Sequence, residues 1–390
     1  MMNQVNRRNF ISKVSKSAAF CAIPVNYYFS KPNQSEKMNK MEASTLVAYL
    51  EEFTNTYRKF SDDHGLREIE CLKIQYPYAF QPVKKGDFFA GRYHGPPLGF
   101  TPQAKAGGFG FYIIEEQFNT LLDKPEIAQE EKFIVNKLLK FWKTENTAFK
   151  TRAAYSPEMQ KALPSDNWTG EPGIAFPLYR MSGTQLDYDK LLQKGIPGMR
   201  EEIQKKMEVT TSVESSELYQ HMLLGLDLLR EVCLDYADEL ASRQMATNSK
   251  KGSVEHLEME QVLRSIADRP PQTMREAMQL MYLYCVMAGS VNYGRMDEYL
   301  GDFFTRDLQQ GKITEQEALV LIEGLWQLID DRGWVFDSRV IIGGKGRRNE
   351  ENANKFAMAA MEASLQLRNV TPQLTLRFYE GQDEKLMDKA

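Results

Sequence analysis

Hydrophobic positions follow a helical spacing over most of the chain, and this pattern predicts a protein built mainly of helices. The first helical segment lies within residues 41–80, where the apolar positions are Leu46, Val47, Leu50 and Phe53. A second amphipathic helix is predicted over 126–150. Gly and Pro are frequent over 86–112, and 157–185 lacks helical periodicity. These two segments are therefore predicted to be loops and strand ends.

The middle of the chain is predicted to hold two long helices. The first begins at Asp187 and is interrupted at 195–198, where two glycines and a proline disfavour a continuous helix. The second is predicted over 217–245, with an apolar stripe formed by Leu218, Met222, Leu226, Leu229, Cys233, Tyr236 and Leu240. Such a stripe is typical of a helix that packs against the core.

Helix boundaries become sharper after residue 268. Pro270 and Pro271 break the chain, and Thr273 can cap a following helix, Met274–Met287. This helix is apolar on nearly every side, which is typical of a helix buried in a large protein. Gly311 is predicted to end the next helix.

The last hundred residues alternate between helices and single strands. Thr314 and Glu317 form a predicted capping box at the start of one helix, and another helix is predicted over 351–367. Residues 340–344 predict a short buried strand that ends in a two-glycine turn, and 373–379 alternate like a strand. The expected fold class is therefore a helix-rich α/β fold with crossover helices.

Composition and charge narrow the functions that this fold can serve. The chain has 390 residues, of which 42% are hydrophobic and 26% are charged, and its net charge is −4. No face rich in Lys and Arg is predicted, so a nucleic-acid partner is not expected. The four cysteines are far apart, and the four histidines lack the spacing of metal ligands. Neither a metal site nor a disulfide scaffold is expected.

The first forty residues differ from the rest of the chain. Arg7 and Arg8 begin a segment that resembles a twin-arginine export signal, and a short apolar stretch follows over 17–25. This stretch is too short to span a bilayer, and a disordered basic tail is the alternative interpretation. In both cases 1–40 are predicted to lie outside the folded domain, which comprises 41–390.

Five segments occur in an order that identifies a family. They are residues 187–192 (DYDKLL), 270–279 (PPQTMREAMQ), 294–300 (GRMDEYL), 343–344 (GG) and 373–377 (QLTLR). Together they resemble the pyruvate formate-lyase-like glycyl radical enzymes, and the resemblance extends over roughly 45–390.

The resemblance implies a fold and a chemistry. The family fold is a ten-stranded barrel of two five-stranded half-barrels wrapped by helices, and this chain is expected to form the first half-barrel. A glycyl radical, installed by a radical-SAM activating enzyme, passes to a cysteine that attacks a small-molecule substrate. The implied reaction is that of a radical lyase or a formate C-acetyltransferase, without a bound cofactor. The implied setting is the cytoplasm of an anaerobic cell, and a homodimer is compatible with it.

The same resemblance predicts that this chain lacks the radical-bearing residues. The family's cysteine loop comes soon after the strand that 374–379 resemble, and the family's glycine motif lies near its C-terminus. Cys233 and Cys285 instead lie within predicted helices. We therefore expect no catalytic residue in this chain, and a fragment of a longer enzyme is the preferred interpretation. The alternative is a non-catalytic exported half-barrel that binds a ligand.

Three residues are predicted to contact the substrate. Family dehydratases place a serine against the substrate hydroxyl at the position of Ser290, although a helix cap beside Gly289 is the alternative role. Arg92 and Arg180 lie in loops among aromatic residues and prolines, where a guanidinium can bind a carboxylate at two points. The alternative role of each arginine is a structural ion pair.

Four other features are predicted to be structural or to restrict the assignment. Asp297 and Arg295 are expected to form an internal ion pair or a cap, and Trp326 and Trp334 to belong to the core or the barrel lining. Residues 343–348 contain Gly and Arg but lack the spacing of a Walker motif, so a turn is predicted there. Residues 182–183 are Ser-Gly where the dehydratases have Gly-His, which weakens a diol dehydratase assignment.

Overall fold

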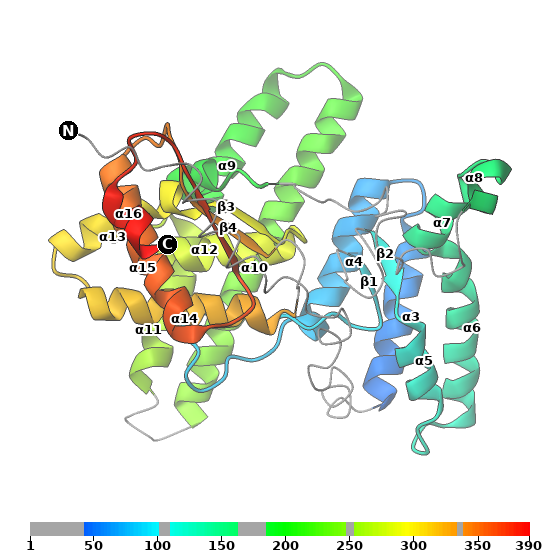
Figure 1. The fold of residues 1–390 in the computed structure, drawn as a ribbon. Coiled ribbons are helices and arrows are strands. Elements are labelled where there is room, and N and C mark those ends of the chain that lie inside the picture. Colours follow the sequence, from blue (N-terminus) through cyan, green and yellow to red (C-terminus); the bar gives the residue numbers. More distant parts are fainter. Residues whose placement is uncertain (1–42, 101–109, 163–184, 247–252, 334–337) are drawn as a thin grey trace, which may run out of the picture. The chain divides into compact units, whose positions relative to one another are not determined.

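Helices form most of the protein, as the hydrophobic pattern predicts (Figure 1). The computed structural model describes residues 43–100, 110–162, 185–246, 253–333 and 338–390. The helix-rich α/β fold class is confirmed. None of the described helices combines the length and the apolar composition that crossing a bilayer requires.

The first described part of the chain is a group of helices around one antiparallel strand pair. Its elements are α3 (Ala43–Lys59), α4 (His64–Ala79), β1 (Leu98–Phe100), β2 (Phe111–Ile113), α5 (Glu115–Leu122), α6 (Gln129–Glu145), α7 (Thr147–Ala153) and α8 (Pro157–Ala162). Aromatic side chains form the core of this group. The ring of Tyr57 meets the ring of Phe111 edge-on at 4.7 Å, and Trp142 donates a hydrogen bond of 2.8 Å to Thr54. The helix predicted over 126–150 is thus two helices, α6 and α7.

Three long helices follow, α9 (Tyr188–Val209), α10 (Val213–Ala246) and α11 (Ser253–Asp268). The predicted interruption of α9 is confirmed at Gly195, which has a φ of 62°. A Cβ atom on Gly195 would lie 2.7 Å from the Cα of Pro270, so both the conformation and the contact require glycine.

The predicted apolar stripe of α10 is only partly in the core. Leu226, Leu229, Cys233, Tyr236 and Leu240 are buried, as predicted. Leu218 and Met222, however, are 56% and 44% exposed, because the first half of α10 has fewer packing partners than the second. The prediction of a continuous core stripe was therefore wrong for its first two positions.

Helix α12 (Met274–Met287) is the central buried helix. Twelve of its fourteen residues are buried, and the side chain of Thr273 caps its start by accepting a hydrogen bond from the backbone N–H of Glu276. Both features were predicted.

A three-stranded parallel sheet lies next in the chain. Its elements are β3 (Asn292–Arg295), α13 (Met296–Gln309), α14 (Glu315–Asp331), β4 (Arg339–Gly343), α15 (Glu350–Leu367) and β5 (Gln373–Arg377), and α16 (Glu384–Lys389) follows. The strand order is β3-β4-β5, with Gly343 opposite Arg377 at the last position. Thr314 and Glu317 form the predicted capping box of α14. Helices therefore connect successive parallel strands, as in other α/β folds.

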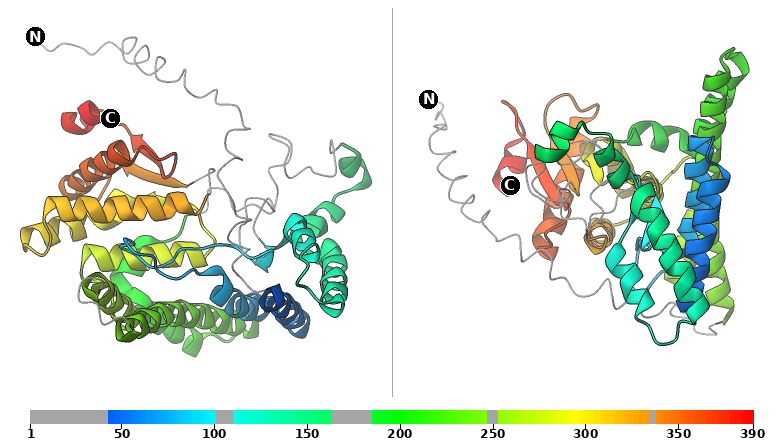
Figure 2. Two further views of the ribbon diagram at one scale, coloured as in Figure 1. Left: turned by 90° about the horizontal axis from the view of Figure 1, so that it is seen from below. Right: turned by 90° about the vertical axis from the view of Figure 1, so that its right-hand side faces the viewer.

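The sheet has one buried face and one open face (Figure 2). Val340 and Ile342 of β4 are fully buried in the core. Ile341 and its neighbour Thr375 on β5 lie on the other face and are more exposed. Among the described residues this sheet has three strands, so the five-stranded half-barrel stays a prediction.

Helices α13 and α15 approach each other closely at Gly301, and this contact gives a testable prediction. A Cβ atom on Gly301 would lie 2.8 Å from the backbone nitrogen of Ala353. We expect Gly301→Ala to lower the free energy of unfolding by about 1–3 kcal/mol, measured by urea denaturation. In the control, Gly225→Ala on α10, no atom lies within 4 Å of the new Cβ. That variant should gain up to about 1 kcal/mol from helix propensity. Equal effects of the two substitutions would contradict the close contact.

Candidate substrate-binding site

The segments before β3 and β5 are bound by the last residues of α14 and by Arg332, which follows that helix. Asp330, Asp331 and Arg332 are consecutive, and their side chains reach three different segments. The carboxylate of Asp330 accepts a hydrogen bond of 2.7 Å from Thr371, which precedes β5. Asp331 pairs with Arg92, and Arg332 binds the turn that precedes β3. Two of the three predicted substrate contacts, Arg92 and Ser290, are thereby brought to one helix end.

Ser290 lies on the turn between α12 and β3 and is 5% exposed. Its backbone N–H donates to Cys285 and the N–H of Gly289 donates to Val286, which is the hydrogen-bond pattern of a Schellman helix end. The positive φ of Gly289, 65°, permits this turn. The predicted alternative, a helix end beside Gly289, is therefore confirmed for the backbone of Ser290.

The Ser290 side chain is held close to the start of β3. Its Oγ accepts a hydrogen bond of 3.3 Å from the backbone N–H of Asn292. The amide oxygen of Asn292 in turn accepts from the N–H of Gly294, at 2.9 Å. These short-range bonds fix the hydroxyl at the amino end of the sheet, and its contact with a substrate stays a prediction.

Arg332 was not predicted from the sequence. Its Nη1 donates to the carbonyl oxygen of Ser290 at 3.1 Å and to the hydroxyl of Tyr293 at 2.9 Å, while its Nε is buried without a hydrogen-bond partner. Among the residues that the structure describes, it forms no ion pair with a carboxylate. A guanidinium beside neutral acceptors is an unusual arrangement, because buried charges are normally paired.

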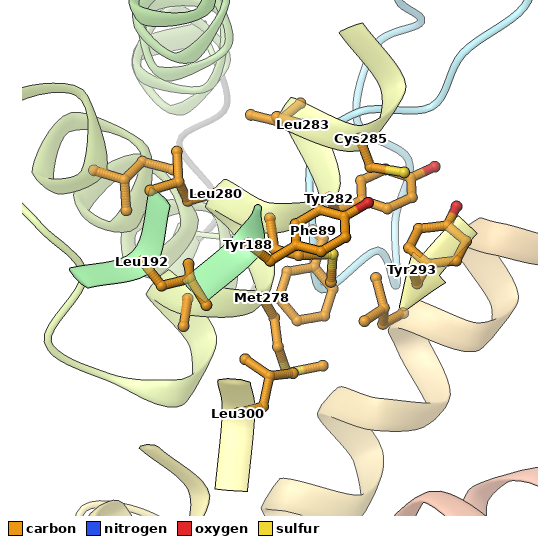
Figure 3. Close-up of a cluster of buried hydrophobic side chains, with 14 of the residues drawn as sticks. Phe89, Tyr188, Leu192, Met278, Leu280, Tyr282, Leu283, Cys285, Tyr293 and Leu300 are labelled. Atoms are coloured by element: carbon orange, nitrogen blue, oxygen red, sulfur yellow. The ribbon is translucent and has the colours of Figure 1, made fainter. Parts of the chain in front are cut away.

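The residues beside Arg332 form a cluster of hydroxyl and thiol groups. Figure 3 shows the sulfur of Cys285 near the hydroxyl ends of Tyr188, Tyr282 and Tyr293. Cys285 is fully buried, and burial raises the pKa of its thiol although Arg332 acts in the opposite direction. The thiol is therefore protonated near neutral pH and behaves as a small core side chain.

Arg92 is engaged by two carboxylates. Its Nε and Nη2 donate to Asp87 at 2.7 and 2.6 Å, and its Nη1 donates to Asp331. Burial alone would raise the pKa of Asp331, but hydrogen bonds from Arg92 and Gln327 lower it. The structural ion pair that the sequence offered as the alternative is present, and substrate binding by Arg92 stays a prediction.

The remaining predicted positions are only partly described. Arg180, the 182–183 pair and Trp334 lie outside the described residues. Trp326 is buried, as predicted, and donates a hydrogen bond of 2.8 Å to Ser364. Asp297 forms an internal ion pair, but with Arg347 at 2.8 Å, so its predicted pairing with Arg295 was wrong. Arg295 is the N-cap residue of α13, and its side chain donates to the carbonyl of Gly343.

The donor set of this site suits organic ligands better than metal ions. Among the described parts of the chain, no group of three His, Cys, Asp or Glu side chains is arranged to hold a metal. A serine hydroxyl and two guanidinium groups can bind hydroxyl or acidic groups of a small molecule.

The burial of the cysteines gives a testable prediction. Cys71, Cys233 and Cys285 are fully buried, and burial raises the pKa of both Cys71 and Cys233 to about 12. A Cys21→Ser variant, which removes the cysteine outside the described residues, should not react with a disulfide reagent at pH 8 when folded. The same variant should react at all three positions in guanidinium chloride. Rapid labelling of any of them in the folded protein, located by peptide mass spectrometry, would contradict this assignment.

Comparison with known proteins shows which family the chain matches. The chain matches the family model described as pyruvate formate lyase-like over residues 26–390. It is 22% identical over 307 residues to the probable dehydratase YbiW of Escherichia coli K12, covering 70% of this chain and 38% of that protein. It is 23% identical over 228 residues to the isethionate sulfite-lyase of Oleidesulfovibrio alaskensis, covering 52% of this chain and 28% of that protein.

A solved structure supports the same fold. The glycerol-bound B12-independent glycerol dehydratase of Clostridium butyricum superposes with a TM-score of 0.67 at 17% identity. The superposition covers 93% of this chain and 50% of the dehydratase. This chain therefore spans about half the length of the dehydratase, and its matches cover less than half of the other two relatives. The chain belongs to the pyruvate formate lyase-like family of glycyl radical enzymes.

Proposed function

We propose that this chain forms the substrate-binding amino-terminal part of a glycyl radical lyase, an enzyme that breaks a C–C or C–X bond in a small molecule. The observation that carries the proposal is the position of Ser290. It is buried on the turn before the first parallel strand, and Arg332 binds its carbonyl oxygen. Such a hydroxyl, held by its own backbone turn, can orient a substrate hydroxyl away from bulk water.

The names of the relatives favour cleavage of a C–X bond. They include a probable dehydratase and a sulfite-lyase, and one structural neighbour is a glycerol dehydratase. A formate C-acetyltransferase reaction is the C–C variant of the same radical chemistry. The Ser290 hydroxyl suits a hydroxylated substrate, and this supports the C–X variant.

On this proposal the chain acts together with the radical-bearing segments of the family and with an activating enzyme. The cysteine and the glycine that carry the radical are supplied by family segments outside these 390 residues, because the described cysteines are buried thiols on helices. A radical-SAM activating enzyme installs the glycyl radical, and a homodimer stays a prediction. The alternative of an exported, non-catalytic binding protein also stays a prediction, because Arg7 and Arg8 lie outside the described residues.

Anaerobic expression tests the proposal directly. The coding DNA of this chain, with its downstream continuation, is expressed together with a radical-SAM activating enzyme. We expect the electron paramagnetic resonance signal of a glycyl radical and turnover of at least one of glycerol, 1,2-propanediol or isethionate. Turnover of pyruvate with coenzyme A alone would instead favour the acetyltransferase variant. The absence of any radical signal in correctly folded protein would refute the proposed function.

The role of Ser290 has a separate expected outcome. Ser290→Ala should lower kcat/KM by about 10- to 100-fold, because a substrate hydrogen bond in a buried site contributes about 1–3 kcal/mol. Ser242→Ala serves as the control, since Ser242 is exposed and donates only within α10. An unchanged kcat/KM in Ser290→Ala would show that the serine is only part of the helix end.

A further inference from the structure

We propose that the carboxyl ends of β4 and β5 form a second binding site, one that takes a phosphate group. The site consists of the Gly343–Gly344 turn, Arg377 at the end of β5 and Gln382 on the following loop. It lies at the opposite end of the strands from Ser290 and Arg332, and it does not depend on the proposed reaction. The sequence predicts a turn over 343–348, which the structure confirms, and the residues around that turn supply the donors.

Gln382 is the first indication of a ligand. Its side chain is 93% buried, since only 7% is exposed, yet neither its Nε2 nor its Oε1 has a hydrogen-bond partner. Its Nε2 is 3.2 Å from the position that a Cβ atom on Gly343 would occupy. A buried amide without partners costs about 1–3 kcal/mol, so such groups normally bind a ligand or another polar group.

Arg377 supplies a positive charge at the same place. It pairs with Gly343 in the strand register, and its Nε is 3.6 Å from the position of a Cβ atom on Gly344. The residue is exposed, and among the described residues its guanidinium forms neither an ion pair nor a hydrogen bond. Lys345, also exposed and without an ion pair in the described structure, adds a second positive charge to the turn.

Two neighbouring carboxylates are already bound, and Glu380 on the same loop forms no ion pair with Arg377 or Lys345 in the described structure. Asp297 accepts hydrogen bonds from Arg347 and from the N–H of Gly343. Glu350 accepts from the N–H of Gly346 and from the hydroxyl of Tyr379, and the Tyr379 bond is the largest cause of its lowered pKa. Arg377 and Lys345 therefore stay available for an anion from solution.

The backbone of the turn adds one donor for an oxyanion. Gly343, Gly344 and Gly346 have φ values of 72°, 85° and 83°. The N–H groups of Gly343 and Gly346 are bound to Asp297 and Glu350, so Gly344 supplies the N–H group that this turn can offer to a ligand. Gly346 leaves the turn open on its side, since no atom lies within 4 Å of the position that its Cβ would occupy. A guanidinium, an amide N–H and backbone N–H groups are the donors that bind phosphate oxygens.

The test is an isothermal calorimetric titration of the whole 390-residue chain, in which inorganic phosphate is added to protein in a phosphate-free buffer. Sulfate, phenyl phosphate and acetate are titrated in parallel. We expect saturable binding of one phosphate per chain and weaker binding of acetate. Binding of phenyl phosphate more tightly than inorganic phosphate would identify a phosphorylated molecule as the ligand, and the reverse order a free ion. Failure of phosphate to saturate below about 10 mM, or acetate binding as tightly as phosphate, would overturn the proposal.

Two variants separate binding from folding. Arg377→Gln should weaken phosphate binding about tenfold or more, because a charge-assisted bond is lost. Arg368→Gln, which removes an exposed arginine from the connection between α15 and β5, should bind phosphate as the unaltered chain does. Gln382→Met should also weaken binding while leaving the midpoint of urea unfolding unchanged or higher in phosphate-free buffer, since the unsatisfied amide is gone. Unchanged phosphate affinity in both Arg377→Gln and Gln382→Met would refute the site.

Discussion

Three consecutive side chains at the end of α14 hold the segments before β3 and β5 in place. Asp330, Asp331 and Arg332 bind Thr371, Arg92 and the Ser290 turn, respectively. Parallel strands are joined by long connections, so their ends need tertiary contacts to stay aligned. The Asp330–Thr371 bond is buried, so the loss of either partner would leave the other group unsatisfied. The candidate substrate site therefore depends on one helix end.

The two ends of the sheet differ in how their polar groups are satisfied. At the amino end, Asn292 and Asp330 have protein partners, and Arg332 is bound through its Nη1 although its Nε has no partner. At the carboxyl end, the fully buried pair of Asp297 and Arg347 closes one side of the Gly343 turn, while Gln382 and Arg377 have no partner in the described structure. The two ends of the sheet therefore differ in structure, which is compatible with a substrate site at the amino end and a phosphate site at the carboxyl end.

Much of the fold could be predicted because its signals are local. The caps at Thr273 and Thr314 and the break of α9 at Gly195 each depend on a few neighbouring residues, and each was confirmed. The apolar stripe of α10 was predicted less well. Its spacing shows which face is apolar, but the exposure of Leu218 and Met222 depends on where other helices end.

The sequence by itself determined the helix-rich α/β class, the family and the position of Ser290 after the buried helix. Only the tertiary structure decided which charged groups meet. Arg347 rather than Arg295 pairs with Asp297, and Arg332 reaches Ser290 from forty-two residues away along the chain. Helix caps and turns depend on bonds between near neighbours, so their signals can be found in the sequence. Partners of buried charges are chosen by the packing of distant elements, and a single sequence carries no pattern that identifies them.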